Sequence, residues 1–92
     1  MKYTVRDSEK LNELIGRTGN TINSFSNAMH ASSSYLKLVV NGKKSVFPPY
    51  AMRIVNLLNK NLVLKKGEER PTIDAIFFDA SVGKSTQNER VS

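Results

Sequence analysis

Cysteine is absent from this 92-residue chain, and histidine occurs only once, at His30. The lack of cysteine excludes a disulfide framework, a thiolate metal site and a cysteine nucleophile. A single histidine without a nearby pair of carboxylates offers no ligand set for a metal ion. We therefore expect no metal, no cofactor and no catalytic residues, and we predict that the protein is not an enzyme.

Long apolar runs are also missing. The longest ones, around residues 36–40 and 75–78, are far too short to span a bilayer. The amino terminus, Met1-Lys2-Tyr3-Thr4, does not lead into an apolar stretch as long as a signal peptide needs. Together with the absence of cysteine, which fits a reducing compartment, this predicts a cytoplasmic protein with no membrane partner.

Acidic residues are scarce in the middle of the chain. Nine bases and a single acid, Glu13, lie between Lys10 and Lys66, whereas acids outnumber bases after Gly67. The overall charge of +6 is therefore concentrated in the central segment. Such a field attracts a polyanion: nucleic acid is the first candidate, and an acidic membrane surface is the competing one. Many small proteins are also basic for solubility alone, so charge by itself does not decide.

A chain of this length with 39% apolar residues can bury one modest core. Four short helices are predicted between residues 8 and 59, because apolar residues recur there at helical spacing. Asp7 or Ser8, Thr21 and Ser32 offer side-chain oxygens as N-caps of the first three helices. The fourth begins at Pro48, since proline is well tolerated in a first turn.

Two short helices separated by a tight turn, with the second capped by serine and followed by lysines, have the geometry of a helix-turn-helix. From Leu11 to Leu58 the sequence resembles the Cro and phage-repressor (XRE) family of DNA-binding proteins. The positions that carry the resemblance are Thr21, Phe25, Ser26, Ala31, Ser32, Leu36, Val39 and the run Asn41-Gly42-Lys43-Lys44. The resemblance implies a mainly α, four- to five-helix, lambda-repressor-like domain over residues 8–60.

Three positions depart from the family pattern. Ser26 replaces a usual alanine and is small enough to keep the helices close. His30 replaces a usual glycine in the turn, where histidine tolerates a positive φ at some strain. Ile22 stands where a polar residue, often glutamine, supports a phosphate contact, so that contact is either lost or made by the backbone amide.

The resemblance implies that a recognition helix at about residues 33–41 enters the major groove. Lys37 is expected to donate to guanine, and Leu38 to meet a thymine methyl group. The base contacts that it implies are Ser33, Ser34, Lys37 and Leu38. The phosphate contacts that it implies are Thr21, Ile22, Asn23, Asn41, Gly42, Lys43 and Lys44. The expected protein is a sequence-specific regulator of transcription, of phage or mobile-element type, which binds double-stranded DNA.

The last third of the chain has short β-branched and aromatic runs. We predict a β-hairpin extension over residues 61–82, with strands at 62–64 and 73–78, and a flexible tail at 83–92. Residues 1–7 form an N-terminal arm or a strand that joins this hairpin. Ile76, Phe77 and Phe78 are candidates for a dimer interface, although packing of Phe77 or Phe78 against the chain's own helices is equally compatible with the pattern.

These elements lead to two hypotheses of different class. In the first, a homodimer binds a pseudo-palindromic operator whose half-sites lie about one helical turn apart. In the second, the protein is an antitoxin or adaptor that binds a protein partner through its C-terminal strands, because an exposed strand edge can accept another strand.

Overall fold

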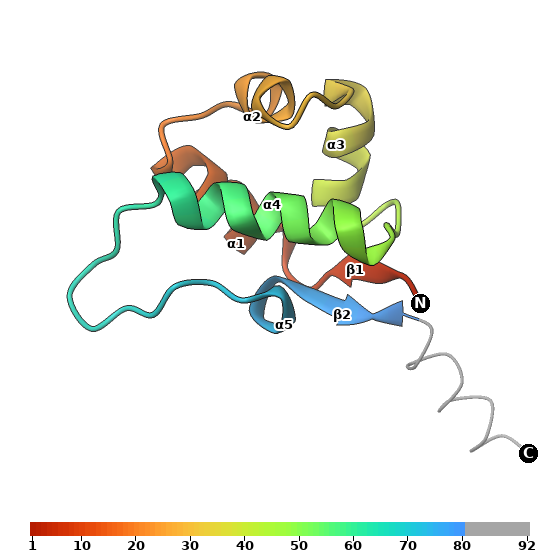
Figure 1. Ribbon diagram of the computed structural model, residues 1–92. Helices are drawn as coiled ribbons and strands as arrows, with labels where there is room; N and C mark the ends of the chain where they lie inside the picture. Colours follow the sequence, from red (N-terminus) through yellow and green to blue (C-terminus); the bar gives the residue numbers. More distant parts are fainter. Residues whose placement is uncertain (81–92) are drawn as a thin grey trace, which may run out of the picture.

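The computed structural model describes residues 1–80, which form five helices and a two-stranded antiparallel sheet that lies at one side of the fourth helix, α4 (Pro48–Asn61) (Figure 1). In chain order the elements are β1 (Tyr3–Val5), α1 (Ser8–Arg17), α2 (Ile22–Ala28), α3 (Ser33–Val40), α4 (Pro48–Asn61), α5 (Ile73–Ile76) and β2 (Phe77–Asp79). The prediction of a mainly helical fold is therefore confirmed. The predicted flexible tail at 83–92 and the end of the predicted extension at 61–82 lie outside the described residues.

The first three helices begin where the sequence offers a capping side chain. Asp7, Thr21 and Ser32 each accept a hydrogen bond from the backbone amide three residues later, at 3.2, 3.1 and 3.3 Å. These bonds satisfy amides that the first turn of a helix leaves without a backbone partner. The predicted starts of the four main helices, including α4 at Pro48, are confirmed.

One core joins all the elements. The predicted apolar faces are buried, and each of α1 to α4 contributes side chains to a single cluster. In Figure 1, α2 and α3 lie on one side of α4, while β1, β2 and α5 lie on the other. The most fully buried side chains include Leu11, Ile15, Phe25, Leu36, Val39, Val40, Ile54, Leu58 and Phe77.

The predicted C-terminal hairpin is wrong. Residues 62–64 are not a strand, and residues 73–76 form the short helix α5. The strand partner of β2 is instead the N-terminal strand β1, with Tyr3 opposite Asp79 and Val5 opposite Phe77. The expectation that an N-terminal strand joins the C-terminal one is thus confirmed, but it replaces the hairpin.

A capping residue explains why residues 73–76 form a helix although Ile73 and Ile76 are β-branched. Thr72 adopts an extended conformation, and its hydroxyl accepts a hydrogen bond from the amide of Ala75 at 3.2 Å. This local bond begins one helical turn, which turns Ile76 into the core at 4% exposure. Local hydrogen bonding therefore outweighs the strand preference of the run.

The two phenylalanines of β2 point to opposite faces, as strand geometry requires. Phe77 is completely buried and meets the ring of Tyr3 edge-on, with centroids 6.3 Å apart. Phe78 is 39% exposed. Ile76 and Phe77 are therefore core residues, and the prediction that they lie at a dimer interface must be corrected. Of the three candidates only Phe78 remains at the surface.

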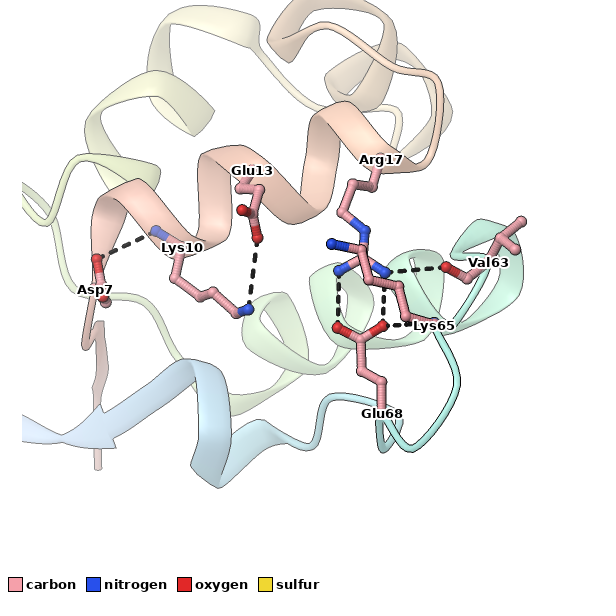
Figure 2. Close-up of polar contacts among 7 residues, drawn as sticks. All are labelled: Asp7, Lys10, Glu13, Arg17, Val63, Lys65 and Glu68. Carbon is pink, nitrogen blue, oxygen red and sulfur yellow. Dashed lines mark hydrogen bonds and ion pairs between the residues drawn. The ribbon is translucent and has the colours of Figure 1, made fainter.

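An ion pair fastens the loop after α4 to the end of α1 (Figure 2). Arg17 donates two hydrogen bonds to the carboxylate of Glu68, at 2.6 and 2.9 Å, and a third to the carbonyl of Val63 at 3.1 Å. The amide of Lys65 donates to the same carboxylate at 3.0 Å. Such a paired fork has a fixed geometry, so the loop is held at a defined place.

Within residues 1–80, no helix has the length and apolar character that crossing a membrane requires.

Acid should weaken this attachment. The hydrogen bonds from Arg17, and then the one from Lys65, lower the pKa of Glu68 to about 2, from an ordinary value of 4.5. Because the pKa is lower in the folded state, the stabilisation is complete above pH 4.5 and is lost as the pH falls toward 2.

The variant Glu68→Gln should therefore have a lower free energy of unfolding at pH 7 than the unmodified protein. The difference between the two should shrink as the pH falls through that window. Denaturant unfolding at several pH values measures it. Glu69→Gln is the control, and an equal pH profile for both variants would contradict the role of Glu68.

Candidate nucleic-acid interface

The turn between α2 and α3 is short and strained at one residue. His30 has a φ of 55°, the only positive φ among the non-glycine residues of the described part. Past this residue the amide of Ala31 donates back to the carbonyl of Ser26 at 2.9 Å. Ser26 itself is completely buried, and its hydroxyl donates to the carbonyl of Asn23 at 2.7 Å. The small buried serine and the left-handed turn together bring α3 close to α2.

Helix α3 is held by its inner face. Leu36, Val39 and Val40 are at most 1% exposed, so this side of the helix is sealed in the core. Tyr35 adds a contact at the flank, where its ring meets Tyr50 of α4 edge-on with centroids 5.4 Å apart. Burial raises the pKa of Tyr50, so its hydroxyl stays neutral over the physiological range.

The outer face of α3 is open to solvent. Ser34 and Lys37 are exposed, Leu38 is 42% exposed, and Ser33 is half-buried. All four residues that the sequence assigned to base contacts thus lie outside the core. Their side chains are available to a partner that approaches α3 from this side.

A hollow of about 450 Å³ lies where the start of α2 faces the start of α3. Its walls combine predicted base contacts from α3 with predicted phosphate contacts from α2. The six residues that line it are Thr21, Ile22, Asn23, Ser33, Ser34 and Lys37. Two segments that the sequence analysis treated separately are therefore brought together in one concave surface.

The hollow is lined by residues from a segment of the sequence without negative charge. The sequence contains no Asp or Glu between Glu13 and Glu68, which covers α2, α3 and the loop that follows them. Within residues 1–80, the ion pairs join Lys10 to Glu13 and Arg17 to Glu68, so they leave Lys37, Lys43 and Lys44 without a carboxylate partner. These lysines can therefore neutralise an external anion without first giving up an internal one.

The predicted phosphate contacts through the amides of Asn41 and Gly42 need correction. The Asn41 amide donates to the carbonyl of Lys37 at 3.1 Å, and the Gly42 amide donates to that of Val39 at 3.0 Å. Gly42 has a φ of 76°, which ends α3 in the left-handed conformation. Both amides are thus already hydrogen-bonded within the end of the helix. An anion at this loop must therefore be bound by the side chains of Lys43 and Lys44, which are exposed.

At the start of α2, one of the three predicted backbone amides is already hydrogen-bonded within residues 1–80, and the other two are not. The Thr21 amide donates to the hydroxyl of Ser24 at 2.9 Å, which completes a capping box. The amides of Ile22 and Asn23 have no acceptor among the described residues. Of the predicted backbone contacts, these two remain available at the rim of the hollow.

A second basic hollow was missed by the sequence analysis. It encloses about 350 Å³ between the end of α2 and the later turns of α4. Arg53, Asn56 and Lys60 supply its polar side, and their spacing along one helix face was the signal that would have found it. The remaining lining residues are Ala28, Met29, His30 and Leu57.

No group of three or more His, Cys, Asp or Glu residues within positions 1–80 is arranged to hold a metal ion. A scan against protein-family models, a search of curated proteins and a search of solved structures found no match for this chain.

The strain at His30 predicts a stabilising substitution. A left-handed conformation costs a residue with a Cβ about 1 kcal/mol, and glycine avoids this cost. His30→Gly should therefore raise the free energy of unfolding by about 1 kcal/mol, measured by urea titration.

Gly42→Ala provides the matched control, because a Cβ at this position would meet no atom within 4 Å and backbone strain alone would act. It should lower the free energy of unfolding by a similar amount. A loss of stability in His30→Gly would show that the imidazole makes a contact worth more than the strain.

Proposed function

We propose that this protein binds double-stranded DNA sequence-specifically and regulates transcription, with α3 lying in the major groove. The observation that carries the proposal is the shared hollow: residues from the starts of α2 and α3 line one concave surface, with Lys37 at its wall and no carboxylate among its lining residues. The major groove of B-DNA is wide enough to admit one α-helix. A helix sealed on its inner face and polar on its outer face suits that groove.

The distribution of charge supports the same reading. Lys43 and Lys44 follow α3 directly and are exposed, so they would lie near the DNA backbone when α3 occupies the groove. Contacts of this kind supply affinity and set the position of the protein, whereas contacts to base edges supply selectivity. Ser34 and Lys37 would provide the latter, because their side chains carry hydrogen-bond donors.

The proposal includes a homodimer on a pseudo-palindromic operator with half-sites about one helical turn apart, as expected for a helix-turn-helix protein of the Cro and phage-repressor type. Phe78 is the surface residue that supports it. It lies on β2, whose strand partner among the described residues is β1, and Val46 is bridged to β1 at Tyr3. Because α3 lies on the opposite side of α4 from β2 in Figure 1, two copies that met through β2 would leave α3 free to bind DNA.

The same edge supports a second candidate function. An adaptor or antitoxin would bind a strand of a protein partner along β2, with Phe78 in the contact. This function needs no base selectivity from α3. Binding to DNA therefore distinguishes the two candidates.

Selection of bound fragments from a random duplex pool, repeated at two salt concentrations, tests the proposal. A regulator should enrich a two-fold symmetric site. Uniform binding that merely weakens with salt would contradict base reading by α3, since backbone contacts alone have that signature. Binding to no duplex at either salt concentration, with copurification of a partner protein, would favour the adaptor.

Two lysine variants separate the expected roles on the selected site. Lys37→Ala should lose about 1 to 3 kcal/mol of binding free energy on that site and much less on random duplex, because a base contact is lost. Lys44→Ala should weaken binding to both about equally and reduce the salt dependence, because a phosphate contact is lost. Fluorescence anisotropy titrations over a salt series measure both quantities.

Lys66→Ala is the control for net charge alone, because Lys66 belongs to the loop after α4, and this loop runs away from α3 (Figure 1). It should leave the preference between the two duplexes unchanged. Equal losses for Lys37→Ala on selected and random duplex would remove Lys37 from the base-reading residues.

A further inference from the structure

Ile22 occupies an unusual position for an apolar side chain. It is the first residue of α2 and packs against the core with part of its surface. Its remaining surface lines the hollow, so it is only half-buried. It is the only aliphatic residue among the six that form the walls, the others being hydroxyl, amide and ammonium side chains.

This composition limits which chemical groups of DNA the hollow can bind favourably. A phosphate placed against Ile22 would exchange water for a hydrocarbon surface that offers no hydrogen bond, which is unfavourable for a charged oxygen. The edge of a base pair in the major groove differs, because it carries an apolar group wherever thymine is present, the C5 methyl. Ile22 can cover that methyl while Ser33, Ser34 and Lys37 bond polar atoms beside it.

Leu38, which was expected to meet a thymine methyl, is the large aliphatic side chain of α2 and α3 that is exposed. Leu38 is 42% exposed but does not line the hollow. A methyl group placed in the hollow would be contacted from two helices, so it would lose more of its exposure to water than one placed against Leu38 alone. Burial from water is what makes such a contact favourable.

From this juxtaposition we propose that Ile22 is a specificity-determining residue that reads the methyl group of one thymine in each half-site. The proposal rests on the DNA-binding function proposed above and assigns the apolar part of its selectivity to α2 instead of α3. The hollow thus has a hydrogen-bonding wall from α3 and a methyl-binding wall from α2.

Replacement of thymine by deoxyuridine tests this directly, because it removes the methyl group and leaves every hydrogen-bonding atom in place. Each thymine of the selected site is replaced in turn, and the dissociation constant is measured with the unmodified protein. One position in each half-site should bind about fourfold more weakly, the loss expected for uncovering one methyl group.

The variants then assign the methyl contact to a side chain. With Ile22→Ala the difference between thymine and deoxyuridine should disappear at that position, and with Leu38→Ala it should persist. Ile22→Val keeps a branched apolar side chain and should retain most of the difference. Thermal unfolding of each variant shows that it is folded, and the scan with the unmodified protein stands even if Ile22→Ala is not.

The outcomes separate this inference from the function on which it rests. A chain that selects a symmetric site in which no thymine responds to deoxyuridine would retain the proposed function and overturn the role of Ile22. A response that disappears in Leu38→Ala and persists in Ile22→Ala would transfer the contact to Leu38 and also overturn it. A chain that selects no site would overturn both proposals.

Discussion

The burial of one face of α3 is the constraint on which the rest of the structure depends. Leu36, Val39 and Val40 are enclosed by the core, so the helix cannot rotate without exposing apolar surface to water. Every property of the opposite face follows from this, because its polar residues are then fixed in direction relative to α2. The hollow exists because two helices that are separately anchored meet at their first turns.

The arrangement of charge complements that packing. At the boundary of the basic segment the carboxylate of Glu68 is paired with Arg17, so it is not available to pair with the lysines beside α3. The lysines beside α3 have no such partner in the described residues, and they keep their field directed to the solvent. Some charged residues, such as Arg17 and Glu68, therefore hold a loop in place, whereas the lysines beside α3 remain available to bind an external anion.

The sequence predicted what local physical chemistry determines and missed what depends on distant partners. Helix starts at Asp7, Thr21 and Ser32 follow from side chains within a few residues, and these predictions hold. The left-handed turn at His30 was expected from the resemblance alone, and it is observed. The hairpin did not hold, because both a local strand at 62–64 and the distant strand β1 fit the alternating pattern of the last strand. Only packing chose between them. The hollow lining was within reach of the sequence, since its members were named one by one. Only the structure shows that these residues line one surface. Only the structure shows that the Asn41 and Gly42 amides are hydrogen-bonded at the helix end.

The pairing of β1 with β2 has a consequence for how the chain folds. The two strands come from opposite ends of the described residues, and the amide of Ala80 donates to the carbonyl of Lys2 at 2.9 Å. During synthesis β1 leaves the ribosome before α1 to α4, and its partner β2 leaves after them. Closing so long a loop is slow, so we expect the contacts among α1 to α4, which are nearer in sequence, to form before the sheet does.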